Sequence, residues 1–360
     1  MLWMWRRQGL KLFFFVLSCV IVSYLTKVIY IPLPPSSGVS ILPEFELKDP
    51  TKQPTKPLPP SSGVSILPEF KSKDPLLCNN DQNSWIRGRL ATAEEASNEV
   101  ARGILNELGQ SVRLHRKQWE FIFIVSSLKK LGMLKPGKRG LVFAAGSEPL
   151  ISYFASLGVE IVATDMDSES ASEKGWSDTN QHAHSLDSLF KEELVDKETF
   201  YKAVSYQTAD MNNLPTEFHG SFDFVWSTCS LEHVGSISLG QTFAINSMAL
   251  LKPGGAAVHT TEFTLSSLKD TLYRGNTVLW RKMDVEHLRD DLRHVGYDIA
   301  DFCWHTGDNA LDQEPDVPPY KPDNHIKLLI SDHVCTSVGW IARKPESFGG
   351  QVSEGKLEVA

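Results

Sequence analysis

Short apolar runs alternate with amphipathic stretches along most of the chain from about residue 90 onward. The apolar runs have the length of buried strands, and the stretches with an apolar residue every three or four positions have the period of helices. The runs predict strands at residues 140–145, 160–164, 202–208, 222–227, 255–261, 297–304 and 333–342. The periodic stretches predict helices at residues 91–108, 117–131, 149–157, around 183–194, 239–251 and 284–295.

This alternation predicts a mostly parallel sheet that is covered by helices on both faces. The last apolar run has no helix between it and the C-terminal tail, so we expect that strand to be antiparallel. The fold class expected is therefore α/β: a Rossmann-like, doubly wound sheet of seven strands within residues 83–345, followed by a flexible tail at 346–360.

The N-terminal region has the pattern of a membrane anchor. Residues 12–25 carry no charge, and the apolar run continues past Lys27, so a span over residues 12–31 is long enough to cross a bilayer. Arg6, Arg7 and Lys11 precede it, which predicts a cytoplasmic tail at residues 1–11 and a lumenal remainder. We expect a single-pass type II membrane protein facing the ER or Golgi lumen. A cleaved signal peptide and an organelle-targeting segment are the alternatives.

Residues 32–82 contain a duplication. The sequence PLPPSSGVSILPEF begins at Pro32 and again at Pro57, with a period of 25 residues. Stacked repeats need three or more units to bury a shared core, and these copies are rich in proline. They predict a semi-extended, disordered stem, with a proline-rich ligand for a partner domain as the alternative.

Composition narrows the function classes. The chain has 360 residues and a net charge of −8, which argues against a nucleic-acid partner. Its five cysteines form no CxxC pair, so neither a zinc site nor a thioredoxin-like site is indicated, and we interpret them as buried or incidental thiols. The sequence leaves open whether Cys78 is paired and what the oligomeric state is.

The loop after the first long strand carries the candidate chemistry. Gly146 lies in it, where close backbone approach needs a residue without Cβ, and Asp165 ends the next strand, where an acid can accept both ribose hydroxyls. A pyrophosphate would be repelled by Glu148 in the same loop. A cationic sulfonium tolerates that acid, so the loop suits S-adenosylmethionine better than NAD.

Four stretches make residues 115–342 resemble a class I S-adenosylmethionine-dependent methyltransferase of the type 11 group. They are LVFAAGSEPL, ATDMD, QTADMNNLP and FDFVWSTCSLEHVG, the last followed by LLKPGG. Ala144 stands where the family more often has the first glycine of its loop. The resemblance implies that Asp210 bonds the adenine amino group and that Met211 flanks the ring. It implies cofactor contacts by Ala144, Gly146, Glu148, Asp165, Met166, Asp210, Met211 and Ser227.

Methyl transfer to a hydroxyl also needs a base near the acceptor oxygen. His233 follows the fourth long strand and Glu262 lies near the end of the fifth, so these two are the candidates for acceptor contact or catalysis. Strand alternation would put His259 and Thr261 on one face. Trp119 could shield the sulfonium, although plain packing is the simpler interpretation, and His182 with His184 lacks a clear third ligand for a metal.

The sequence thus predicts a membrane-tethered methyltransferase that uses S-adenosylmethionine. Because an anchor followed by a stem resembles the layout of secretory enzymes that modify glycans, a glycan or small-molecule hydroxyl is the first acceptor hypothesis. Two alternatives stay open: an NAD-dependent oxidoreductase, which the loop disfavours, and a non-catalytic binding module that retains the fold.

Overall fold

The computed structural model describes residues 64–70, 87–173 and 181–347, all within one compact unit, Pro57–Ala360. The predicted membrane anchor, most of the stem and nearly all of the C-terminal tail lie outside these residues. Within the described ranges, no helix is both long and apolar enough to cross a bilayer.

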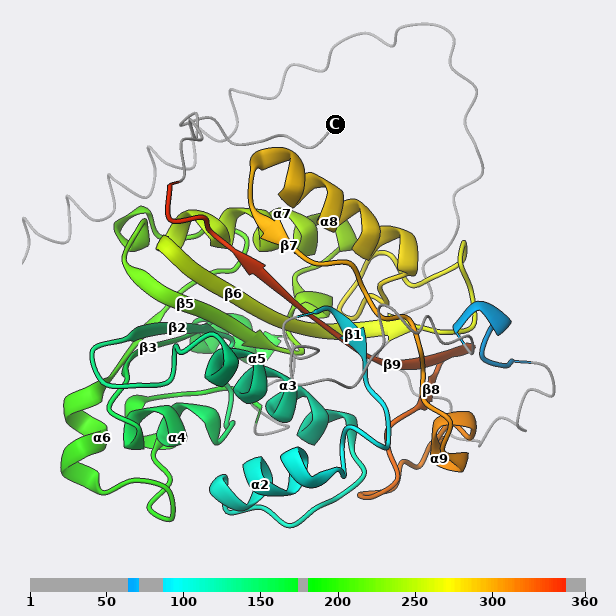
Figure 1. Ribbon diagram of the computed structural model, residues 1–360, viewed down its shortest axis with the longest axis horizontal. Coiled ribbons are helices and arrows are strands. Elements are labelled where there is room, and N and C mark those ends of the chain that lie inside the picture. The colour runs from blue at the N-terminus through cyan, green and yellow to red at the C-terminus, as the bar shows by residue number, and fades with distance from the viewer. Residues whose placement is uncertain (1–63, 71–86, 174–180, 348–360) are drawn as a thin grey trace, which may run out of the picture. The chain divides into compact units, whose positions relative to one another are not determined.

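A mixed sheet organises the domain (Figure 1), in the strand order β1-β9-β6-β5-β2-β3-β4, with β7 and β8 also paired to β9. Strands β4, β3, β2, β5 and β6 are parallel, and β9 runs antiparallel to β6, as predicted for the last strand. The described sheet has nine strands rather than seven, because the short strands β1 and β8 add to it. The strands are β1 (Arg89–Leu90), β2 (Arg139–Phe143), β3 (Glu160–Asp165), β4 (Val204–Thr208), β5 (Phe222–Thr228), β6 (Leu251–Thr264), β7 (Asp298–Ile299), β8 (Leu328–Ile330) and β9 (His333–Arg343).

Helices pack on both faces of this sheet, which confirms the doubly wound α/β class (Figure 1). They are α2 (Glu99–Glu107), α3 (Arg116–Lys130), α4 (Leu150–Ser156), α5 (Ser168–Glu173), α6 (Lys197–Ala203), α7 (Ile237–Ser247), α8 (Lys282–Val295) and α9 (Ala310–Gln313).

Successive residues of the strands serve opposite halves of the core. Val142 packs with the helices α2, α3, α4 and α6, whereas Leu141 and Phe143 pack with α7 and α8. This follows from the pleat, which points alternate side chains to opposite faces. The nearly continuous apolar runs read from the sequence are therefore those of strands buried on both sides.

Three predicted elements differ from the structure. Residues 183–194 hold a 3₁₀ turn at Leu186–Leu189 instead of the predicted α-helix. The helix α6 follows it and overlaps the start of the strand that was predicted at residues 202–208. The backbone there bonds to other elements, since Ser152 Oγ donates to Leu189 O and accepts from Lys191 N. A predicted strand at 297–304 is reduced to β7.

The helix predicted at residues 91–108 begins only at Glu99. Asn98 has extended backbone angles, and its side chain accepts a hydrogen bond from Ala101 N at 2.9 Å, which makes it the N-cap of α2. Asparagine is among the residues that cap helix starts most effectively. The local cap therefore overrides the periodic pattern that continues upstream of it.

The second copy of the duplication departs from the predicted extended stem. Over residues 64–70 it packs on the domain, and Ile66 and Phe70 are buried in the same core cluster as α7 and α8. Leu67 N donates to Leu265 O at 3.0 Å, beyond the end of β6. Two apolar side chains that fit an existing core surface are enough for docking, although they are too few to build a core of their own.

The cysteines within the described residues are of two kinds. Cys229 and Cys335 are free, whereas Cys303 is disulfide-bonded, and its partner lies outside the described residues. The interpretation of all five cysteines as incidental thiols is therefore wrong for Cys303.

Candidate active site

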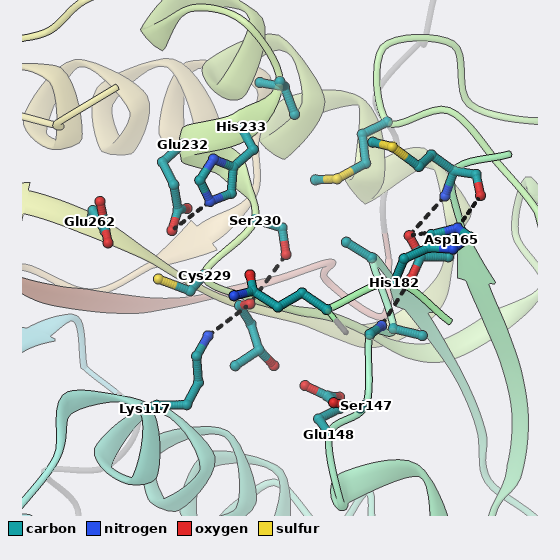
Figure 2. A pocket seen from close by; sticks show the side chains of 18 of the residues that line it. Lys117, Ser147, Glu148, Asp165, His182, Cys229, Ser230, Glu232, His233 and Glu262 are labelled. Atoms are coloured by element: carbon teal, nitrogen blue, oxygen red, sulfur yellow. Dashed lines mark hydrogen bonds and ion pairs between the residues drawn. The ribbon is translucent and has the colours of Figure 1, made fainter. Parts of the chain in front are cut away.

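A cavity of about 500 Å³ opens at the carboxyl ends of β2, β3, β4 and β5, with the end of β6 and the start of α3 closing one side (Figure 2). Ligands of open α/β sheets lie at this edge, and the volume is that of a small-molecule site. Figure 2 shows Asp165 and His182 on one side of it and Glu232, His233 and Glu262 on the other. We call these the cofactor half and the acceptor half.

The loop after β2 makes the floor between the two halves. Ala144 and Gly146 both line the cavity and both have positive φ, 52° and 53°. A Cβ at Gly146 would come within 2.9 Å of Gln181 O, so only glycine fits there. Ala144 adopts a left-handed conformation that glycine takes without cost and alanine does not. The alanine thus keeps the geometry of a glycine loop under strain.

Asp165 lies beside Gly146 and lines the cavity, but its carboxylate is also part of the scaffold. Oδ2 accepts hydrogen bonds from Gly146 N at 2.9 Å and Ala183 N at 3.0 Å, and Oδ1 accepts from Met166 N at 2.9 Å. A carboxylate offers about four acceptor positions. The three N–H groups occupy three of these positions, so one remains for a ligand. Asp165 therefore offers one free acceptor position rather than one for each of the two ribose hydroxyls.

The rest of the cofactor half is built by Met166, Asp210 and Met211, which all line the cavity. Asp210 lies exposed at the rim, where Oδ1 accepts from Asn212 N at 2.8 Å. His182 Nε2 is 2.7 Å from Met166 O, which requires a proton on that nitrogen. The other ring nitrogen, Nδ1, is 3.0 Å from Nδ1 of His184. His182 therefore holds the backbone of Met166.

Glu148 is buried in the cavity wall, and Trp226 Nε1 donates to its Oε1 at 2.8 Å. Burial raises the pKa of Glu148 to about 7, against the opposing effect of the hydrogen bond from Trp226 and of the Lys117 charge. A positive sulfur centre nearby would favour the ionised form. The buried acid therefore fits the cationic donor that the sequence predicted for this loop.

Two residues near the strand ends do not reach the cavity. Ser227, predicted to contact the cofactor, is fully buried, and its Oγ lies 2.8 Å from His259 Nδ1. His259 packs against Phe243 and Trp340, and burial lowers its pKa to about 3. Alternation along β5 and β6 points both side chains into the core rather than over the sheet edge. Ser227 thus does not line the cavity, unlike the other residues predicted to contact the cofactor.

Trp119 also belongs to the core. Its indole Nε1 donates to Glu95 Oε2 at 2.9 Å, and its ring stacks on Phe123 with the centroids 5.2 Å apart. Trp119 is therefore a core residue, as the simpler interpretation of the sequence expected.

The acceptor half is lined by Glu262, as predicted from its position near the strand end. Oε1 of Glu262 pairs with Arg116 Nη2, while Oε2 is buried and has no hydrogen-bond partner. Burial raises the pKa of Glu262, and the nearby Glu232 carboxylate raises it further, against the attraction of Arg116. A buried carboxylate oxygen without a partner and with a raised pKa is suited to accept a proton.

Glu232 faces Glu262 from the 3₁₀ turn Leu231–His233. It is fully buried, Thr261 Oγ1 donates to its Oε2 at 2.8 Å, and its Oε1 has no hydrogen-bond partner. His233, the other predicted candidate, also lines the cavity. Its Nδ1 lies 2.7 Å from Asn276 O, so this nitrogen carries the proton, and Nε2 is 3.9 Å from Glu232 Oε1.

Cys229 completes a group of three potential metal ligands with Glu232 and Glu262, whose ligand atoms lie within 4.8 Å of one another. Arg116 Nη1 lies 3.0 Å from Cys229 Sγ, and the same guanidinium pairs with Glu262. Burial raises the pKa of the Cys229 thiol well above its ordinary value. A bound guanidinium and a protonated thiol both disfavour a cation, so the group does not suit a metal.

Sequence reasoning missed most of the acceptor half. Arg116 and Lys117 come from the start of α3, and both pair with the fully buried Glu120. Consecutive basic residues at a helix start are common on protein surfaces. Only the docking of α3 against β9 and the end of β6 turns them towards the cavity.

Comparison with known proteins agrees with the fold and the cavity. Residues 141–259 match the sequence model of a family described as a methyltransferase domain. No curated protein sequence matches the chain. The match places a methyltransferase domain at residues 141–259. S-adenosylmethionine-dependent methyl transfer is the activity that the match, the sheet and the cavity support, and the match favours it over the oxidoreductase.

Solved structures with the same general fold are distant. Phosphoethanolamine N-methyltransferase 2 of Haemonchus contortus with S-adenosylmethionine shows 14% identity over 68% of this chain and 57% of that one, at a TM-score of 0.39. The 1,6-didemethyltoxoflavin-N1-methyltransferase of Burkholderia thailandensis shows 14% identity over 61% of this chain and 74% of that one, at a TM-score of 0.35. The chain spans 57% of the CurJ carbon methyltransferase, at 14% identity, 70% coverage of this chain and a TM-score of 0.35. Similarities at this level do not bear on the acceptor.

Proposed function

We propose that this methyltransferase transfers its methyl group to a hydroxyl of a small acceptor and that Glu262 takes the hydroxyl proton. The observation that carries the proposal is the buried, unpartnered Oε2 of Glu262 at the cavity wall. Bound S-adenosylmethionine supplies an electrophilic methyl group. The loop at Ala144–Glu148, with Asp165, would hold it in the cofactor half.

The reaction balances with this chain's own groups. The acceptor oxygen forms a bond to the methyl carbon while the sulfur–carbon bond breaks, and the proton moves to Glu262 Oε2. Alignment of donor and acceptor supplies most of the rate enhancement, and the base removes the charge that would otherwise develop on the oxygen. The nearby Glu232 carboxylate raises the proton affinity of Glu262.

Glu262→Gln tests the role of the carboxylate. The change keeps the size of the side chain and a contact to Arg116, so methyl transfer should fall about 10²–10⁴-fold while S-adenosylhomocysteine affinity stays the same. Labelled S-adenosylmethionine with fractionated extract would measure the transfer, and calorimetry the affinity. Full activity in this variant would contradict the proposal, and an equal loss of affinity would place Glu262 in cofactor binding instead.

The acceptor hydroxyl can come from a free small molecule or from a glycan, and the two sources are separable. A pool of small metabolites and a pool of released glycans, assayed side by side with the wild-type chain and Glu262→Gln, distinguish them. Glu262-dependent label in one pool identifies the source. Label transferred only to primary amines would contradict the hydroxyl acceptor while leaving the methyltransferase activity intact.

We also propose that the chain is membrane-tethered through residues 12–31 with its catalytic domain in the ER or Golgi lumen. The apolar N-terminal run and the basic residues before it support this topology. The disulfide at Cys303 supports it too, because disulfides persist in oxidising compartments. Protease protection in sealed microsomes is the test: digestion of the domain without detergent would exclude a lumenal location.

A further inference from the structure

The docked segment 64–70 has an identical counterpart in the chain. The sequence VSILPEF occupies residues 64–70 and also residues 39–45. The structure describes residues 64–70 and shows which residues this sequence packs against. We call the residues that receive it, Phe263, Leu265 and Thr306, the docking surface.

The docked segment is held by main-chain hydrogen bonds and by one aromatic side chain. Leu67 N donates to Leu265 O at 3.0 Å, and Thr306 donates to Phe70 O from N at 3.1 Å and from Oγ1 at 3.0 Å. The ring of Phe70 meets that of Phe263 edge-on, with the centroids 5.6 Å apart at 85°. The turn Pro68–Phe70 sets these groups in place, closed by Phe70 N donating to Leu67 O.

The burial pattern shows which side chains matter. Ile66 is 5% exposed and Phe70 is fully buried, whereas Ser65, Pro68 and Glu69 face solvent. Both buried side chains recur in the upstream copy as Ile41 and Phe45, and the proline that shapes the turn recurs as Pro43. Every contact of the docked segment is therefore one that the upstream copy can make with the same atoms.

We propose that residues 39–45 are a second occupant of the docking surface and compete with residues 64–70 for it. The two copies differ only in the number of residues that connect each of them to the rest of the domain. Gly88, whose carbonyl accepts from Cys303 N at 2.9 Å, is 18 residues beyond Phe70 and 43 beyond Phe45. If closure entropy depends on length alone, it favours the nearer copy by less than about tenfold.

The docking surface is next to the acceptor half of the cavity. Phe263 directly follows the candidate base Glu262, and Leu265 is three residues beyond it. Leu265 N donates to Val334 O, on β9, at 2.7 Å. An occupied docking surface therefore supports the end of β6. Exchange of the two copies preserves this support and moves the docking point by 25 residues along the chain.

The test compares Phe45→Asp, Phe70→Asp and the double variant in the full chain. Aspartate cannot occupy the buried ring position, so each change disables one copy. Phe45→Asp should leave the melting temperature unchanged, and Phe70→Asp should lower it by less than about 3 °C because the upstream copy takes over. The double variant should lose about 5 °C or more. A single Phe70→Asp change as damaging as the double variant would overturn the proposal.

Hydrogen exchange provides a second readout that does not depend on the double variant folding. In Phe70→Asp, peptides covering residues 39–45 should exchange at least several-fold more slowly than in the wild type, because Leu42 N–H replaces Leu67 N–H at Leu265 O. The matched control is Glu69→Asp, an exposed position of the same segment, which should leave exchange at residues 39–45 unchanged. Unaltered exchange of residues 39–45 in Phe70→Asp would refute competition by the upstream copy.

Discussion

The cofactor half of the cavity is held together by backbone hydrogen bonds, whereas the acceptor half is held together by charged side chains. Asp165 fixes the cofactor half through three backbone N–H groups, one from each of three segments. In the acceptor half, Arg116 and Lys117 are balanced against Glu120, and Arg116 against Glu262. Backbone groups have little freedom to rearrange, while buried ion pairs depend on every partner being present.

The difference between the halves matches what each must do. A cofactor common to a whole family needs a fixed shape, which the backbone provides. Chemistry at the acceptor needs a group whose proton affinity can be tuned, and only ionisable side chains provide this. Mutations in the cofactor half should therefore change the affinity for the cofactor, and mutations in the acceptor half should change stability or turnover.

The largest stability effect is expected from Arg116→Ala. The change leaves Glu120 and Glu262 buried without this cation, which should lower the free energy of unfolding by about 3–5 kcal/mol. Urea denaturation at pH 7 measures it. The matched control is Arg139→Ala, since Arg139 pairs with Glu160 at the surface and its loss should cost less than about 1 kcal/mol. Equal effects at the two positions would mean that the acceptor half does not depend on its ion pairs.

A smaller effect, on affinity, is expected from Asp165→Asn. The amide has one acceptor oxygen and an NH₂ group that faces the loop's N–H donors, so the loop loses bonds that position the cofactor. Affinity for S-adenosylhomocysteine should fall by about 1–3 kcal/mol, measured by calorimetry. Asp167→Asn is the control, because Asp167 caps α5 at the surface and asparagine caps equally well. An unchanged dissociation constant in Asp165→Asn would move the cofactor out of this half.

Glu148 predicts a pH dependence that separates the sulfonium from its neutral product. With a pKa of about 7, the carboxyl is mostly protonated at pH 6 and mostly ionised at pH 8. The ionised form attracts the cation, so affinity for S-adenosylmethionine should rise about tenfold over this range. Affinity for S-adenosylhomocysteine should not show this rise, and Glu148→Gln should abolish it. Identical pH profiles for both ligands in the wild type would exclude a sulfonium beside Glu148.

The raised pKa of Glu148 also predicts how the stability of the folded state depends on pH. The folded state holds a proton on Glu148 up to about pH 7, whereas the unfolded chain releases it near the ordinary glutamate value. The contribution of Glu148 to stability therefore falls as pH rises from about 4.5 to 7. Glu148→Gln should remove this fall, and denaturation curves at pH 5 and pH 8 would show it.

The smallest effect is expected from Ala144→Gly. Relief of the left-handed strain at Ala144 should stabilise the domain by up to about 1 kcal/mol, seen as a small rise in melting temperature. Ala145→Gly is the control, because Ala145 is buried and outside the positive-φ region, and its loss should destabilise by a similar amount. A fall in both variants would show that the loop tolerates alanine at position 144 without strain.

The local pattern of the sequence was sufficient to predict the parallel sheet, the antiparallel last strand and the loop with Gly146 and Asp165. Each of these depends on short-range properties: the apolar period of a strand, the freedom of glycine, and the position of an acid at a strand end. The same reasoning failed at residues 183–194, where Ser152 and Asp165 from other elements take the backbone groups that a helix would use.

Only the tertiary structure decided the partners in the cavity and at the docking surface. Arg116 reaches Glu262 across 146 positions of sequence, and no local pattern predicts a pair at that separation. Asp165 turned out to hold the loop as well as face the cavity, and Phe70 was found to be core rather than stem. Sequence periodicity encodes which face of an element is apolar, but burial, pKa and hydrogen-bond partners depend on which elements meet, and that is settled only when the whole domain packs.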